Sequence, residues 1–201
     1  MLKINIALIY PKEVYGLNNI HTNSVFSNQG VLPPLTLLYI ATTLNKNGHK
    51  CKIIDANAEN LSLSEVTKII IDEKIDMIGF SIHADSLKFN LPYIKKLREK
   101  TKCSIFVGGV NVEYFYEKLI KEEYIDYVTR GNSLDLLKFV NSLTKGENLN
   151  NINGLVSKKN KKIYTNDYIN KREDFLKCSL PDWSLLNVKL YHSFLTPNGF
   201  G

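Results

Sequence analysis

Five short apolar runs alternate with segments of helical periodicity along residues 4–145 of the chain. Each run is mostly apolar on both faces, which is typical of strands buried inside a parallel sheet. Strands that alternate with helices in this way form a parallel sheet through right-handed crossovers. We therefore predict a doubly wound α/β fold with five parallel strands in the spatial order 2-1-3-4-5. The predicted strands span residues 4–10, 50–55, 76–81, 103–107 and 125–129.

The segments between these strands carry helix signals. Pro34 suits the first turn of a helix, and Asn47-Gly48 supplies a stop signal. The sequence SLSE at residues 62–65 is a capping-box pattern. The predicted helices span residues 34–47, 62–73, 86–100, 112–121 and 132–145.

Residues 11–33 form an unusually long connection between the first strand and its helix. Long connections on the ligand side of a sheet are usually functional or disordered. This one is polar with aromatic anchors. We predict that it is mobile without ligand and becomes ordered over a ligand or against a partner domain.

The pattern changes towards the C-terminus. Residues 153–157 and 161–165 flank the turn Lys158-Lys159-Asn160, which predicts a two-stranded hairpin. Residues 166–201 show little periodicity and are typical of a linker that packs on another domain. We therefore divide the chain into an α/β domain at residues 1–148 and a hairpin with a linker at residues 149–201.

Composition limits the classes of function. The net charge is +6, but the lysines are scattered, and the one dense run at residues 158–162 has no interleaved aromatic residue, so nucleic-acid binding is the weakest hypothesis. Cys51, Cys103 and Cys178 lack disulfide or metal-ligand spacing, and the first two are expected to be core thiols in a reducing compartment. No segment resembles a signal peptide or a membrane span, so we expect a cytoplasmic protein.

Open sheets of this type bind ligands beyond the carboxyl ends of their strands, so the residues that follow each strand are the candidate site. No P-loop, G-x-G-x-x-G motif or nucleophile elbow occurs in the chain. We therefore assign no catalytic residue and no metal ligand, and expect the chain alone not to be a catalyst. The candidate cofactor-binding residues are Asp55, Ser81, His83, Gly108, Gly109, Val110, Arg130 and Gly131.

Each candidate has an alternative role. Gly108-Gly109 allows the backbone to approach a bulky ligand, or forms a tight turn. Ser81 offers a hydrogen bond to a ligand, or caps a turn. Arg130 pairs with a ligand oxygen, or with a protein carboxylate. His83 could hold a metal or transfer protons, but a lone loop histidine is most often solvated or hydrogen-bonded.

Several short motifs occur along nearly the whole chain: PPLTLLYIA at 33–41, GHK at 48–50, IIDAN at 53–57, DMIGFS at 76–81, FVGG at 106–109, DYVTRG at 126–131, NGL at 153–155 and LPDW at 180–183. In their order and spacing, these motifs resemble the N-terminal cobalamin-binding domain of cobalamin-dependent radical-SAM proteins.

The resemblance implies a flavodoxin-like fold with cobalamin over the carboxyl edge of the sheet. Ser81 and Gly108-Gly109 match the positions that line the nucleotide tail of the cofactor in that family. The resemblance also implies a partner, a radical-SAM catalytic domain of the same parent protein that carries a [4Fe–4S] cluster and S-adenosylmethionine. We expect the chain to be a fragment that ends about where that domain would begin.

The chain departs from the family pattern in three places. Tyr10-Pro11-Lys12-Glu13 stands where the wider fold often has D-x-H-x-x-G, so the histidine that ligates cobalt is absent. Arg130-Gly131-Asn132-Ser133 stands where relatives commonly have R-G-E-G-E, so the two glutamates of that motif are absent. The C-x-x-x-C-x-x-C motif of the iron–sulfur cluster does not occur.

Two function classes therefore compete. The first is a cobalamin-binding module of a radical-SAM enzyme, methyltransferase-like in its use of the cofactor. The second is a stand-alone flavodoxin-like module that binds a nucleotide or flavin, or that serves as a protein-interaction domain. Absorbance distinguishes them, because a corrinoid gives a red protein and a flavin a yellow one.

Overall fold

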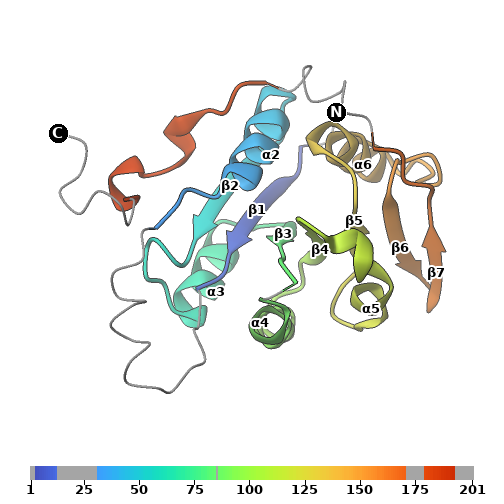
Figure 1. Ribbon diagram of the computed structural model, residues 1–201, viewed down its shortest axis with the longest axis horizontal. Coiled ribbons are helices and arrows are strands. Elements are labelled where there is room, and N and C mark those ends of the chain that lie inside the picture. The colour runs from blue at the N-terminus through green and yellow to red at the C-terminus, as the bar shows by residue number, and fades with distance from the viewer. Residues whose placement is uncertain (1–2, 13–30, 85, 171–178, 193–201) are drawn as a thin grey trace.

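The computed structural model describes residues 3–12, 31–84, 86–170 and 179–192 of the chain. Within them, one sheet in the order β2-β1-β3-β4-β5-β6-β7 runs through the molecule, with helices on both faces (Figure 1). The strands are β1 Asn5–Tyr10, β2 Lys50–Asp55, β3 Met77–Ser81, β4 Ser104–Gly108, β5 Tyr127–Thr129, β6 Leu155–Lys159 and β7 Lys162–Thr165. The α-helices are α2 Leu35–Lys46, α3 Leu63–Asp72, α4 Leu87–Lys100, α5 Tyr116–Lys121 and α6 Ser133–Lys145.

The parallel part of the sheet confirms the predicted doubly wound α/β fold. Strands β1 to β5 are parallel and lie in the order 2-1-3-4-5. The capping box at Ser62 is present, with its hydroxyl accepting a hydrogen bond from the Glu65 amide. The predicted helix at residues 112–121 is instead broken at Phe115 into a short 3₁₀ turn, η1 Val112–Tyr114, and α5.

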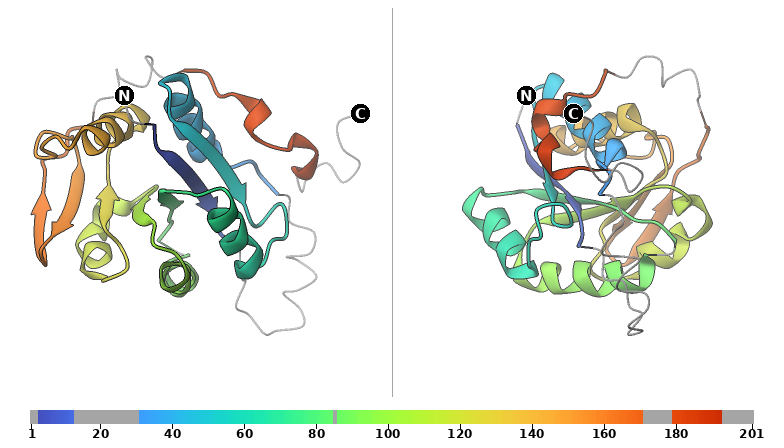
Figure 2. Two further views of the ribbon diagram at one scale, coloured as in Figure 1. Left: turned by 180° about the vertical axis from the view of Figure 1, so that it is seen from behind. Right: turned by 60° about the vertical axis from the view of Figure 1, so that its left-hand side comes forward.

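The predicted hairpin is present, but it continues the sheet instead of standing apart from it. Strand β6 pairs antiparallel with β5, placing Val156 opposite Val128, and β7 follows β6 at the sheet edge (Figure 2). The sheet therefore has seven strands where five were predicted. Both valines are fully buried, so β6 covers an edge of β5 that would otherwise expose unpaired backbone groups.

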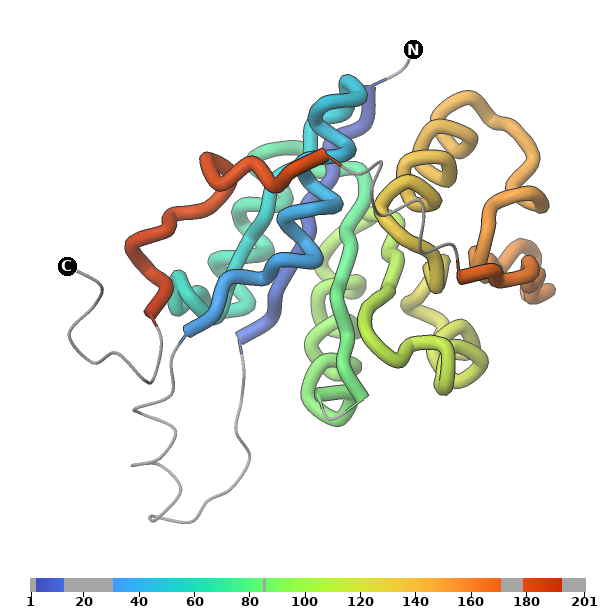
Figure 3. The backbone as a smooth tube through the Cα atoms, turned by 45° about the horizontal axis from the view of Figure 1, so that its top comes forward, coloured from blue at the N-terminus to red at the C-terminus, as the bar shows by residue number. Residues whose placement is uncertain are grey.

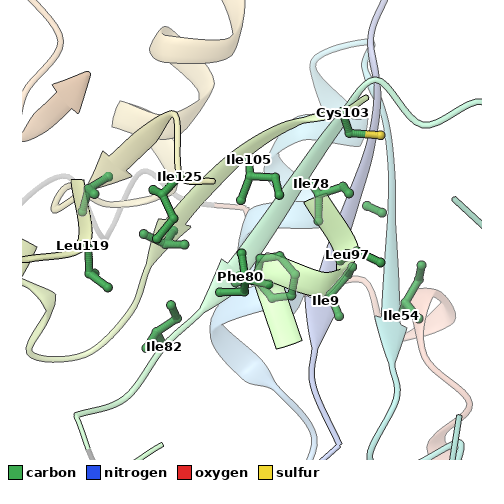
Figure 4. Packing of buried hydrophobic residues seen from close by; sticks show 14 of the residues in the cluster. Ile9, Ile54, Ile78, Phe80, Ile82, Leu97, Cys103, Ile105, Leu119 and Ile125 are labelled. Atoms are coloured by element: carbon green, nitrogen blue, oxygen red, sulfur yellow. The ribbon is translucent and has the colours of Figure 1, made fainter. Parts of the chain in front are cut away.

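The two faces of the sheet hold separate hydrophobic clusters. Because side chains alternate along a strand, Ile78 and Phe80 of β3 point to the face covered by α3, α4 and α5 (Figure 4). Met77 of β3 and Phe106 of β4 belong to the opposite cluster, under α2 and α6. This second face is the one that matters for the candidate site.

The cysteines agree with the predicted core thiols where the structure describes them. Cys51 and Cys103 are buried and free, and the Cys103 thiol donates a hydrogen bond to the Ile75 carbonyl over 2.9 Å. Burial raises the pKa of both thiols above the ordinary value for cysteine. Cys178 lies outside the described residues. No helix in the described part of the chain is long and apolar enough to cross a membrane.

The segment at residues 179–192 lies along α2 and reaches the carboxyl end of β2 (Figure 3). It contains two 3₁₀ turns, η2 Trp183–Leu185 and η3 Val188–Leu190. The Asp182 amide donates to Thr42 Oγ1 on α2 over 2.9 Å, and the Tyr191 hydroxyl donates to Asp55 Oδ2 over 2.9 Å. The final described residue, His192, forms an antiparallel bridge with Val31 just before α2.

The prediction that residues 11–33 are mobile and close over a ligand falls largely on residues 13–30, which lie outside the described residues. It stays a prediction.

The Tyr191–Asp55 hydrogen bond is expected to fix the end of the segment at residues 179–192. Tyr191→Phe removes the donor to a carboxylate that is only 2% exposed, and should cost about 1–3 kcal/mol of unfolding free energy in urea. It should also speed hydrogen exchange at the His192 amide. Tyr164→Phe, on the exposed strand β7, is the matched control and should change neither measurement. Equal behaviour of the two variants would contradict the assignment.

Candidate functional site

A cavity of about 190 Å³ lies between the sheet and helices α2 and α6, at the carboxyl ends of β3, β4 and β5. It is far larger than a single water and smaller than a pocket for a complete large ligand. The cavity therefore has the size for one substituent of a larger ligand, the rest of which would lie outside the cavity. Its lining residues are Leu8, Thr36, Leu37, Ile40, Gly79, Phe80, Ser81, Phe106, Gly108, Gly109, Val110, Thr129, Arg130, Gly131, Asn132 and Leu136.

The wall of the cavity depends on strand residues that lack side chains. A Cβ atom at Gly79 would lie 2.2 Å from Cζ of Phe106, so the phenyl ring occupies the space above that glycine. The Phe106 ring also makes an edge contact with Phe139 of α6, with the ring centroids 6.4 Å apart. The sequence thus places a fixed aromatic ring beside the cavity.

Gly109 requires glycine for two independent reasons. Its φ of +128° is a conformation that residues with a side chain rarely adopt. A Cβ atom there would lie 2.5 Å from the Ile82 carbonyl oxygen and 3.1 Å from Ser81 Oγ. The tight-turn role of the glycine pair is therefore present in the structure, and the same turn lines the cavity.

Ser81 is the last residue of β3, and it is 8% exposed. Its side chain lines the cavity, and no hydrogen-bond partner for its hydroxyl occurs within the described residues. The alternative role as a turn cap is taken by Ser86, whose hydroxyl donates to the His83 carbonyl over 3.0 Å. Ser81 thus offers a donor and an acceptor to a bound group.

Arg130 makes protein contacts that hold the loop after β5. Its guanidinium donates to the carbonyls of Gly154 and Asn166, and Nη1 lies 3.3 Å from the Glu113 carboxylate. The group also lies 4.4 Å from the centroid of the Tyr116 ring, and the side chain is 6% exposed. The predicted alternative of a protein ion pair is therefore observed, while the residue still borders the cavity.

Asn132 caps helix α6 next to the cavity. Its Oδ1 accepts hydrogen bonds from the amides of Leu134 and Asp135, at 2.9 and 3.1 Å. The buried Asp135 carboxylate accepts in return from the Asn132 amide and from Asn153 Nδ2. The departure from R-G-E-G-E thus leaves an asparagine in the capping position, and the cap fixes the Gly131–Asn132 turn.

Two predicted site residues, Asp55 and His83, do not line the cavity. The Asp55 carboxylate accepts hydrogen bonds from the amides of Asn57 and Ala58 and from the Tyr191 hydroxyl. Burial raises the pKa of Asp55, although these hydrogen bonds oppose the shift. His83 is half-buried in the turn closed by Ser86. The cavity brings together the other six predicted residues: Ser81, Gly108, Gly109, Val110, Arg130 and Gly131.

Sequence reasoning missed the helix residues of the cavity. Leu37 and Ile40 on α2, and Leu136 on α6, carry apolar side chains at helical spacing and therefore look like ordinary core positions. The Asn132 capping pattern, with aspartate three residues later, was a usable local signal. Among the described residues, no group of three or more His, Cys, Asp or Glu side chains could hold a metal ion.

The model of the B12 binding domain family matches residues 25–138, which is more than half of the chain. This chain belongs to the B12-binding domain family. The matched region contains helix α2, the start of helix α6 and every predicted cofactor-binding residue.

Two curated proteins are similar in sequence. An uncharacterised methyltransferase of Pyrococcus horikoshii is 30% identical over 171 residues, which cover 83% of this chain and 37% of that protein. The anaerobic magnesium-protoporphyrin IX monomethyl ester cyclase of a Synechocystis species is 28% identical over 165 residues, covering 80% of this chain and 33% of the cyclase. The B12-binding chain thus spans about a third of the length of these relatives.

Solved structures share the fold at low sequence identity. The radical S-adenosylmethionine methyltransferase TsrM of Kitasatospora setae, with cobalamin and a [4Fe-4S] cluster bound, has a TM-score of 0.66 at 14% identity, over 83% of this chain and 31% of TsrM. The cobalamin-dependent radical enzyme OxsB, with aqua-cobalamin and S-adenosylmethionine bound, has a TM-score of 0.67 at 14% identity, over 89% of this chain and 24% of OxsB. They confirm the predicted flavodoxin-like architecture of the B12-binding domain.

The Arg130 contacts predict local stability beside the cavity. Arg130→Lys loses the planar guanidinium fork and should cost about 1.5–3 kcal/mol of unfolding free energy, with faster hydrogen exchange at the amides of residues 131–135.

Arg98→Lys is the matched control. Arg98 forms a two-point pair with Asp126, at 2.7 and 3.0 Å, between α4 and the start of β5. Its loss should speed exchange near α4 and leave residues 131–135 unchanged. If both variants loosen the same residues, Arg130 does not fix this turn in particular.

Proposed function

We propose that the chain binds cobalamin, with the nucleotide tail of the cofactor in the cavity between α2 and α6 and the corrin ring over the carboxyl edge of the sheet. One observation carries the proposal. The free hydroxyl of Ser81 and the Gly108-Gly109 turn line the same largely apolar cavity at that edge. Membership of the B12-binding domain family supports the same cofactor.

The residues present fit a nucleotide tail. Gly109 lets the turn after β4 pass close to the Ile82 backbone, because a Cβ atom there would lie 2.5 Å from the Ile82 carbonyl oxygen, and this turn lines the cavity. The apolar helix residues cover the faces of a flat ring, and Ser81 offers it one hydrogen bond. Burial of the tail and this hydrogen bond would supply the affinity.

The protein offers no imidazole where histidine-ligated relatives have one. Tyr10-Pro11-Lys12 follows β1, and the Lys12 ammonium donates to Asn60 Oδ1. His83 lies outside the cavity lining, in the turn after β3. We propose that cobalt keeps water or no ligand on its lower face, since the base of the tail occupies the cavity.

The proposal extends to a partner. We propose that this module serves a radical-SAM catalytic domain of a longer parent protein, which would hold a [4Fe–4S] cluster and S-adenosylmethionine. When bound, cobalamin supplies the chemistry of a methyl-group carrier. Two findings support this arrangement. The curated relatives are about three times as long as the matched region, and the solved structures of TsrM and OxsB contain cobalamin together with a [4Fe-4S] cluster or S-adenosylmethionine. The chain's own contribution is to bind, orient and bury the cofactor.

A titration with hydroxocobalamin tests the proposed site. Wild type should bind and turn red, while Gly109→Leu should bind at least 100-fold more weakly, because a side chain there meets the Ile82 backbone and displaces the turn that lines the cavity. Circular dichroism and urea unfolding establish that the variant folds. A folded Gly109→Leu variant with wild-type affinity would show that the tail site is wrong.

Two further variants separate the roles of the polar residues. Ser81→Ala should weaken binding about fivefold, corresponding to about 1 kcal/mol for one neutral hydrogen bond. His83→Ala should leave both the affinity and the visible spectrum unchanged. A spectral shift confined to His83→Ala would instead make His83 the lower ligand. If the purified protein retains a yellow flavin and binds no corrinoid, the alternative of a stand-alone flavodoxin-like module is favoured.

A further inference from the structure

The polar side chains of the cavity are nearly all engaged by the protein. Thr129 Oγ1 donates to the Val107 carbonyl over 3.4 Å, and Asn132 Oδ1 accepts two amides of α6. The Arg130 guanidinium is held by Gly154, Asn166 and Glu113. Thr36, in the first turn of α2, is exposed at the rim. Ser81 therefore remains as the one buried side-chain hydroxyl among the described lining residues without a partner.

The rest of the lining is apolar. Leu8 and Phe106 come from the sheet, Leu37 and Ile40 from α2, and Leu136 from α6. Such a surface accepts the faces and edges of an aromatic ring with few polar atoms. It penalises a ring that carries several, because each buried donor or acceptor loses its water without gaining a partner.

We infer that this cavity selects corrinoids by their lower base, favouring a benzimidazole over an adenine. The inference rests on the proposed function and deepens it. A benzimidazole that is not bound to cobalt presents one ring-nitrogen acceptor, which matches the single free hydroxyl of Ser81. Adenine adds further ring nitrogens and an exocyclic amino group, whereas Ser81 is the one buried side-chain hydroxyl among the described lining residues that is free to meet them.

Ile40 is the specificity-determining residue that the structure makes easiest to test. It lies on α2, lines the cavity and is half-buried, whereas Leu37 and Leu136 are buried in the packing of α2 and α6. A glutamine at position 40 would introduce a donor and an acceptor into the cavity. Methionine has a similar size and shape and stays apolar, so Ile40→Met is the matched control for Ile40→Gln.

The experiment measures the Kd of the 201-residue chain for three corrinoids by absorbance. They are cobalamin, the analogue with adenine as the lower base, and cobinamide, which lacks the nucleotide tail. Wild type should bind cobalamin at least tenfold more tightly than the adenine analogue, and cobinamide more weakly than cobalamin. Ile40→Gln should reduce the cobalamin-to-adenine ratio to less than threefold, while Ile40→Met should retain it.

The outcomes separate this inference from the proposed function. If none of the corrinoids binds, the proposed function fails and the inference fails with it. If cobinamide binds as tightly as cobalamin, the tail does not occupy the cavity. If wild type binds cobalamin and its adenine analogue equally, the module stands and the base selection is wrong. If the Gln and Met variants change the ratio equally, polarity at position 40 does not determine the choice. Unfolding midpoints in urea verify that both variants are folded.

Discussion

The close approach of β4 to its neighbours, at positions without side chains, is the constraint on which the site depends. Gly79 allows the Phe106 ring to lie against β3, Gly108 lies against Thr129, and Gly109 turns beside the Ile82 backbone. A Cβ atom at any of the three would come within 2.6 Å of a neighbouring atom. All three glycines line the cavity between the sheet and helices α2 and α6.

A second set of contacts holds the other side of the cavity. The hairpin β6–β7 does more than cover the edge of β5, because Gly154 and Asn166, just before and after it, accept hydrogen bonds from Arg130. Asn153 binds Asp135, which closes the capping box with Asn132. The turn after β5 is thereby fixed from the hairpin side and from α6. The region after residue 148 thus holds the turn that lines the cavity, although its sequence pattern set it apart.

Local sequence patterns were enough to predict the parallel sheet, its strand order and most helices, because apolar periodicity reports directly on burial. They also singled out Ser81 and Gly108-Gly109, which follow or end strands and line the cavity. They did not predict that β6 joins β5, because pairing between strands is a non-local choice. Ile40 and Leu136 were missed because an apolar residue that lines a cavity has the same sequence signal as one that fills a core. Asp55 and His83 lie at or just after strand ends, as predicted. They are outside the cavity lining, because the cavity forms at the ends of β3, β4 and β5 under α2 and α6.

We propose that the cavity holds the tail of a corrinoid whose base has left cobalt, and a crystal structure of the chain with hydroxocobalamin would test this. We expect density for the benzimidazole between α2 and α6, with its free ring nitrogen within hydrogen-bond distance of Ser81 Oγ and its edge against Gly109. Density that shows the base still on cobalt, with the cavity between Phe106 and Ile40 unfilled, would contradict it.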